Sequence, residues 1–184
     1  MTTSACRITD EEDFKTFAEC YAHAYGASIL SVDFLRNCDE VYLFRDDEGQ
    51  PFAGYSINVK QEYRTLSYIP KEIADHLRAR AQGLDTYELG TLWLDATRRS
   101  FRERLELSAH MFGNIISRAG SIMVANTVSE ELYRLYADRG VKLAYFGPMD
   151  DGHGGCIDGW IFYLEDVASS KVPEAYEQFK KRLG

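Results

Sequence analysis

A single glutamate, Glu88, interrupts an apolar run in the segment YELGTLWLD (87–95). A carboxyl group that points into an apolar surface is partly desolvated, which raises its pKa toward the range in which a general base works. In an extended strand, side-chain alternation puts Glu88 on the same face as Leu92 and Leu94. The segment therefore indicates a general base, with a solvated glutamate at a strand edge as the alternative.

Four arginines lie where this strand gives way to a helix: Arg98, Arg99, Arg102 and Arg104. The free N–H groups of a first helical turn attract phosphate, and the planar fork of an arginine binds phosphate through its side chain. The joint therefore favours an anionic ligand. In the alternative, the first turn is solvated, and Arg99 pairs with Glu103 and Arg102 with Glu106.

The composition excludes several classes of protein. The 184 residues, 45% hydrophobic and 27% charged, suit one globular domain that spans residues 1–184. The formal net charge of −8 disfavours a nucleic-acid partner. The sequence has no apolar leader and no apolar stretch long enough to span a membrane, so we expect a soluble cytoplasmic protein with no membrane partner.

Metal and hydrolase chemistry find little support in the sequence. The 4 cysteines and 4 histidines are dispersed and lack the spacing of metal ligands. There is also no Gly-x-Ser-x-Gly segment of the kind that presents a nucleophilic serine. We therefore expect neither a metal site nor a hydrolase.

Hydrophobic periodicity predicts the order of the elements. Helices are predicted after a capping box at Thr9–Glu12, from Ser31 to Leu35, Pro70 to about Gln82, about Ser100 to Ala119, Ser129 to about Arg139, and near the C-terminus. Strands are predicted at 40–45, 51–59, 85–95, 121–126, 141–147 and 156–165, and 60–66 could extend as a strand. This order predicts a mixed α/β (α+β) fold whose sheet is mostly antiparallel, with one parallel step within 85–126.

This order, and the residues of the second half, resemble the GCN5-related N-acetyltransferase (GNAT) superfamily. There the fourth strand often begins with a carboxylate and ends in an apolar run before the acyl-CoA phosphate loop. Glu88 matches the carboxylate, and Leu92, Trp93 and Leu94 match the run. The resemblance implies a GNAT-like three-layer fold with a central, splayed sheet flanked by helices, and a donor held by main-chain groups around Leu92 and Leu94.

A second stretch, SEELYRLYADRGV (129–141), is similar to the superfamily's Asn-x-x-Ala-x-x-Leu-Tyr-x-x-x-Gly-Phe. Tyr136 and Gly140 match it, whereas Ser129 stands where asparagine is expected and Val141 where phenylalanine is. In many members this tyrosine protonates the departing thiolate. The resemblance therefore implies Tyr136 as the general acid and Ser129 as a donor-binding residue, with a tyrosine packed on an amphipathic helix as the alternative.

The donor loop departs from the pattern of the superfamily. That pattern is Arg/Gln-x-x-Gly-x-Gly/Ala, and the matching register from Arg99 puts Arg102 and Arg104 at both glycine positions. Side chains there obstruct the close approach of the main chain to a pyrophosphate. Three explanations stay open: the arginines bind the donor through their side chains, the chain keeps the fold without the cofactor, or the turn is solvated.

The first explanation covers two donors, a CoA thioester and the phosphopantetheine arm of an acyl carrier protein. The homoserine-lactone autoinducer synthases and the N-acyl amino acid synthases are branches with carrier-protein donors. The segment 87–95 is similar to the Trp-Glu-Leu-Ser-Arg-Phe stretch of the lactone synthases, although Thr91 stands where they have arginine.

Together these resemblances imply an N-acyltransferase that uses acetyl-CoA or another acyl-CoA as co-substrate, without a metal. Glu88 would take a proton from an amine acceptor and Tyr136 would protonate the thiol. The acceptor would approach past the first helices and the last hairpin. A homodimer stays open, and the contrasting hypothesis is a binding module that keeps the fold without catalysis.

Overall fold

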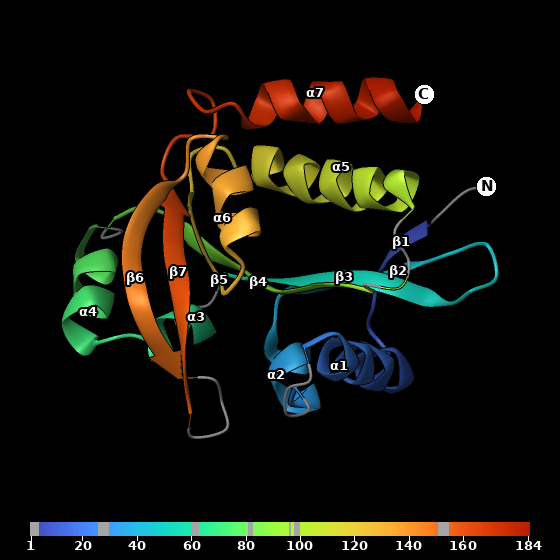
Figure 1. Ribbon diagram of the computed structural model, residues 1–184, viewed down its shortest axis with the longest axis horizontal. Helices are drawn as coiled ribbons and strands as arrows, with labels where there is room; N and C mark the ends of the chain where they lie inside the picture. The colour runs from blue at the N-terminus through green and yellow to red at the C-terminus, as the bar shows by residue number, and fades with distance from the viewer. Residues whose placement is uncertain are drawn as a thin grey trace.

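The described strands form one seven-stranded sheet, in the order β1-β2-β3-β4-β5-β7-β6 (Figure 1). The structure is a computed structural model, and it describes residues 4–25, 30–59, 63–80, 83–95, 97, 100–150 and 155–184. The strands are β1 (Ser4–Arg7), β2 (Glu40–Arg45), β3 (Pro51–Asn58), β4 (Thr86–Leu94), β5 (Ile122–Thr127), β6 (Lys142–Asp150) and β7 (Cys156–Leu164). Only the β4–β5 pair is parallel among them. The predicted mixed sheet with one parallel step is confirmed.

Helices cover both faces of this sheet. They are α1 (Glu11–Tyr25), α2 (Val32–Asn37), α3 (Arg64–Ser67), α4 (Lys71–Arg80), α5 (Phe101–Ser117), α6 (Glu130–Ala137) and α7 (Val172–Leu183). In Figure 1, α5 and α7 lie above the sheet, and α1 and α2 lie below it. Helices α5, α6 and α7 share one core cluster with sheet residues such as Tyr55 and Leu89, while α1 and α2 pack around Trp93 on the other face. The predicted three layers are therefore confirmed.

Serine caps fix the starts of three helices. Ser31, Ser100 and Ser129 each accept the N–H of the residue three positions on, at the starts of α2, α5 and α6. The expected cap of α1, Thr9, is wrong. The carboxylate of Asp10 accepts the N–H of Asp13 at 2.8 Å instead, because Asp10 directly precedes the first helical residue.

Two other predicted elements differ from the structure. Residues 64–67 form the short helix α3 and do not extend a strand. The helical spacing of Phe101, Leu105, Phe112 and Ile115 in the sequence predicts one apolar face on α5, and Leu105, Phe112 and Ile115 are buried accordingly, but Phe101 keeps 64% of its surface exposed. Phe101 is the first helical residue, and the buried face of α5 begins only at Leu105.

Candidate functional site

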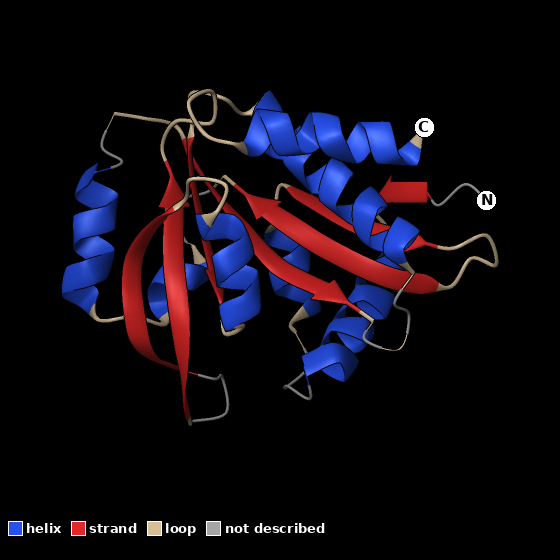
Figure 2. Cartoon of the chain, turned by 45° about the horizontal axis from the view of Figure 1, so that its top comes forward, coloured by secondary structure: helices blue, strands red, loops and turns tan. Residues whose placement is uncertain are grey.

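The two parallel strands separate part of the way along their length. Their pairing runs from Thr86 with Ile122 to Leu89 with Ala125 and ends there. Strand β4 nevertheless continues to Leu94, paired on its other edge with β3. Figure 2 shows the resulting divergence between the strands on the β4 side and those on the β5 side. Beyond Leu89, the β5-facing edge of β4 is therefore open to a ligand.

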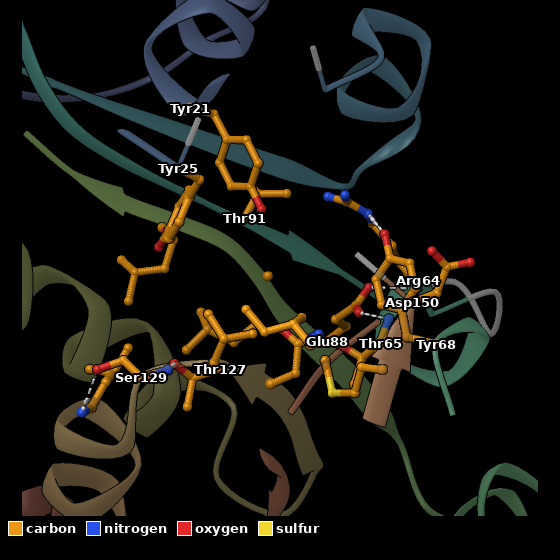
Figure 3. Close-up of a pocket in the computed structure, with 18 of the residues that line it drawn as sticks. Tyr21, Tyr25, Arg64, Thr65, Tyr68, Glu88, Thr91, Thr127, Ser129 and Asp150 are labelled. Atoms are coloured by element: carbon orange, nitrogen blue, oxygen red, sulfur yellow. Dashed lines mark hydrogen bonds between the residues drawn. The ribbon is translucent and has the colours of Figure 1, made fainter. Parts of the chain in front are cut away.

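A cavity of about 430 Å³ occupies the region of this separation. Its lining comes from α1, α3, the middle of β4, the end of β5 and the start of α6 (Figure 3). The lining includes the polar or aromatic side chains of Tyr21, Tyr25, Arg64, Glu88, Thr91 and Ser129. Residues of α2, β6 and β7 complete the described lining, so the cavity joins segments that lie far apart in the sequence, as ligand sites commonly do.

A β-bulge shapes the β4 wall of the cavity. Gly54 of β3 pairs with Trp93 and Ser56 pairs with Gly90, so two β4 residues oppose Tyr55 alone. Thr91, one of the two, has a φ of 48°, which a threonine rarely adopts. Its hydroxyl donates to the Ser56 hydroxyl at 2.7 Å inside the protein, which helps to hold the strained backbone. Bulges occur next to active sites, where they re-aim side chains.

The bulge reverses the side-chain alternation along β4. Leu92 and Leu94 pack against the α5 face together with Leu89, whereas Trp93 lies among α1 and α2. Glu88 contacts α3, on the opposite face from Leu92 and Leu94. The prediction that Glu88 shares a face with those leucines is wrong, because one extra residue shifts every later side chain to the other face.

Glu88 is 3% exposed, and both of its oxygens accept main-chain hydrogen bonds. The N–H of Thr65 donates to one oxygen at 2.6 Å and the N–H of Arg64 to the other at 3.1 Å. Burial raises the pKa of the Glu88 carboxyl, and these hydrogen bonds oppose the rise only in part. The result is a fixed carboxylate in the cavity wall with an increased affinity for a proton.

Tyr25 reaches the bulge from α1. Its hydroxyl donates to the carbonyl of Leu92 at 2.5 Å. The residue as a whole is 49% exposed, but desolvation, and in second place the neighbouring Tyr21, raise the pKa of Tyr25 to about 12. A neutral phenol therefore stands at the open edge of β4.

The structure does not bring Tyr136 to this cavity. The Tyr136 side chain is 3% exposed and its hydroxyl donates to the sulfur of Met111 on α5 at 3.3 Å. Its ring packs against Phe162, and burial raises the pKa of its phenol. Tyr136 turns from α6 into the core, so its geometry matches the packed aromatic of the alternative hypothesis and not a proton donor to a bound thioester.

The residues expected to bind the donor are only partly brought together. Leu92 and Ser129 line the cavity. Trp93 packs edge-to-face against Phe17 at 5.8 Å, and Leu94 belongs to the core beneath α5. Neither of these two side chains is part of the described lining.

The arginines at the start of α5 give a mixed result. Arg99 lies outside the described residues. Arg102 pairs with Glu106 at 2.9 Å, as the solvated-turn alternative predicted, and Arg104 is exposed.

The part of the chain that the structure describes holds no cluster of three residues able to bind a metal ion. None of its helices is long and apolar enough to cross a membrane.

Three parts of the site could not be recognised from the sequence. Arg64 and Thr65 belong to a four-residue helix whose first N–H groups bind the distant Glu88, so no local pattern marks them. Thr91 carries no local signal for positive φ, since asparagine or glycine is usual there. Tyr21 and Tyr25 were expected as helix residues only, although their spacing of four places both rings on one face.

Comparison with known proteins identifies the fold. No protein-family model and no curated protein sequence matches the chain. Several solved structures are similar to the chain. FeeM, an N-acyl amino acid synthase from uncultured soil microbes, is similar with a TM-score of 0.68 and 12% identity, over 96% of this chain and 94% of that chain.

Two acetyltransferases are also similar to this chain. The ribosomal-protein-S18-alanine N-acetyltransferase from Escherichia coli has a TM-score of 0.61 and 15% identity, over 91% of this chain and 96% of its own. A GNAT superfamily phosphinothricin acetyltransferase from Sinorhizobium meliloti, in complex with acetyl-CoA, has a TM-score of 0.58 and 13% identity, over 90% of this chain and 89% of its own. The GNAT fold expected from the sequence is confirmed.

Proposed function

We propose that this GNAT-fold protein is an N-acyltransferase, which moves an acyl group from an acyl-CoA directly to an amine acceptor. The observation that carries the proposal is the separation of β4 from β5 with Glu88 buried in the wall of the resulting cavity. An extended donor needs unpaired main-chain groups along its path, and the chemistry needs a base beside it. The same few residues of β4 supply both.

The donor fits the open edge of β4. The amides of a pantetheine arm would pair with main-chain groups near Leu92, as an added strand does at a sheet edge. A backbone N–H at the bulge would stabilise the oxyanion, worth about 3 kcal/mol for one well-aimed donor. The phosphates would lie toward α5, where Arg102 and Arg104 would bind them with side chains in place of a glycine-rich loop. Ser129 stands across the cavity at the start of α6.

The transfer needs no covalent enzyme intermediate. Glu88 takes a proton from the acceptor ammonium, directly or through a water molecule, and the neutral amine attacks the thioester carbon. The C–N bond forms and the C–S bond breaks. The second proton of the amine nitrogen passes through water to replace the proton that a phenol gives to the departing sulfur, and Glu88 releases the first proton to solvent, so both side chains return to their starting states. The departing sulfur receives a proton, and we assign Tyr25 rather than Tyr136 as the hydroxyl that supplies it, because Tyr25 reaches the bulge.

Thioester binding and turnover test the proposal. Calorimetric titration measures the affinity of the protein for CoA, acetyl-CoA and hexadecanoyl-CoA. The release of free thiol in the presence of a mixed panel of primary amines measures the rate of acyl transfer. Thioester binding together with amine-dependent thiol release, lost in Glu88→Gln, is the expected result. Thioesters that bind without any transfer would indicate the non-catalytic binding module.

A carrier protein is the second candidate for the donor. Two observations favour it: both glycine positions of the donor loop are arginine, and the N-acyl amino acid synthase is similar with a TM-score of 0.68, against 0.61 and 0.58 for the two acetyltransferases described above. The discriminating measurement repeats the assay with an acylated carrier protein. Transfer from it, combined with silence from every CoA thioester, would replace acyl-CoA as the donor.

A further inference from the structure

Arg64 places a cation among aromatic rings at the Glu88 end of the cavity (Figure 3). The carbon of its guanidinium lies 5.4 Å from the ring centre of Tyr68, 5.5 Å from that of Phe34 and 5.9 Å from that of Tyr21. Rings at such distances attract a cation and hold its plane in place. The guanidinium is therefore a positioned group and not a freely moving surface charge.

The hydrogen bonds of Arg64 leave its binding face available. Its Nε donates to the hydroxyl of Tyr68. Among the described residues, no acceptor bonds to the two terminal nitrogens and no carboxylate forms an ion pair with Arg64. Those two nitrogens form the fork that binds a carboxylate in a bidentate way. Arg64 is half-buried and lines the cavity, and a guanidinium in such a place suits an anionic group of a ligand.

The main chain of Arg64 is held against the Glu88 carboxylate. The N–H of Arg64 itself donates to Glu88 at 3.1 Å, so the base and the guanidinium are joined through a single residue. An acceptor that places its amine at Glu88 therefore lies in the same cavity as the Arg64 side chain. The lining carries the acidic side chains of Glu88 and Asp150 together with Arg64, a combination that suits a molecule with both an ammonium group and a carboxylate.

We infer that Arg64 binds a carboxylate of the acceptor, and that the acceptor is an α-amino acid whose amine meets Glu88. The inference rests on the proposed function and adds the class of the acceptor to it. The aromatic rings act on Arg64 and keep its fork toward the cavity. Because a cation already occupies the space among these rings, they do not form a cage for a cationic acceptor.

A substrate panel with matched variants tests the inference. Each of the twenty L-amino acids is tested with acetyl-CoA and hexadecanoyl-CoA, and the best acceptor is then compared with its C-terminal amide. Wild type should use the amide about 100-fold less efficiently in kcat/KM, because a site built for a polar group rejects the analogue that lacks it. In Arg64→Gln, the amino acid should fall to the level of the amide through a raised KM, while the amide changes less than about threefold.

Two further variants separate recognition from folding. Arg64→Lys keeps the charge without the fork and should give intermediate selectivity. Arg78→Gln removes an exposed arginine on α4, which pairs with Asp75, and should match wild type. Neither Arg64 variant removes the N–H that binds Glu88, so both proteins should fold, with a Tm lowered by no more than about 2–4 °C through the lost contacts with the aromatic rings.

The outcomes distinguish this inference from the proposed function. If amides and simple amines are acylated as well as amino acids, the role of Arg64 is overturned and the N-acyltransferase stands. If no amine is acylated, calorimetry with the twenty amino acids decides: binding to wild type that is lost in Arg64→Gln supports the carboxylate site, although the proposed function fails. Absence of both binding and turnover overturns the inference.

Discussion

Replacing Gly54 by alanine tests whether the bulge in β4 depends on close packing from β3. A Cβ on Gly54 would lie 2.5 Å from Cε2 of Phe17, 2.7 Å from Nε1 of Trp93 and 2.9 Å from the carbonyl oxygen of Tyr42. Packed heavy atoms normally sit about 3.5–4.0 Å apart, so each neighbour would have to move by roughly 0.6–1.0 Å or more. Phe17 and Trp93 are 0% and 2% exposed, and Tyr42 contributes main chain, so none of the three yields easily.

The expected cost in folding free energy is about 3 kcal/mol, the upper end of the range for overpacked cores. Because Gly54 pairs with Trp93 directly after the bulge, the displacement would also change the position of Leu92, and acyl transfer should fall with stability. Chemical denaturation measures the first effect as a lower midpoint at an unchanged m-value. The thiol-release assay measures the second.

Gly113→Ala is the matched control. Its Cβ would meet only the ring of Tyr176, at an ordinary 3.4 Å, and alanine stabilises a helix interior by about 0.5–1 kcal/mol relative to glycine. The control should therefore be as stable as wild type or more so, with full activity. A Gly54→Ala protein whose stability stays within about 0.5 kcal/mol of wild type would refute the reasoning that β3 packing fixes the bulge.

Three further predictions concern the chemistry. Glu88→Gln should lower kcat/KM by about 10²–10⁴-fold, with the largest loss above the pKa of the Glu88 carboxyl and below that of the amine, where a base is present and little amine is neutral. In wild type, activity should rise as the Glu88 carboxyl loses its proton, with a midpoint above the ordinary glutamate pKa because burial raises it. An equal loss across the pH range would remove Glu88 as the base. Tyr25→Phe should reduce kcat by more than about tenfold while Tyr136→Phe changes it less than about twofold, and the reverse order would restore Tyr136 as the acid. Arg104→Gln should raise the KM for acyl-CoA about threefold or more at low salt and less at high salt, whereas an unchanged KM would favour the solvated turn.

Elements that depend on local pattern could be predicted from the sequence. The amphipathic periodicity of the sequence predicts the extents of α1, α5 and α6 to within a few residues. Three serines predict helix starts, and each of them is an N-cap in the structure. The turn residues between β2 and β3 give the hairpin. In each case, the determining interactions lie within one turn or one pair of neighbouring strands.

The parts that could not be predicted depend on contacts between distant residues. The helix α3 begins where Glu88, from β4, accepts the N–H groups of Arg64 and Thr65. Tyr136 follows the helical period, but only the position of Met111 on α5 shows that its hydroxyl turns into the core. The GNAT pattern marks Glu88, which lines the cavity, and Tyr136, which is not among its described lining residues, because a sequence pattern records residue spacing and not the direction of a side chain.

The strain at Thr91 has a physical role in the separation of the two parallel strands. A non-glycine residue at positive φ costs on the order of 1 kcal/mol, and the Thr91–Ser56 hydrogen bond and the burial of Trp93 can offset it. Without the bulge, β4 would keep its alternation and Trp93 would turn toward α5, away from its contact with Phe17. The pairing with β5 ends at Leu89, two residues before Thr91, so the backbone that leaves the regular ladder is also the backbone that borders the cavity. The stability of the α1 face and the opening for a donor are therefore coupled through one residue, and a substitution that relaxes Thr91 should affect both.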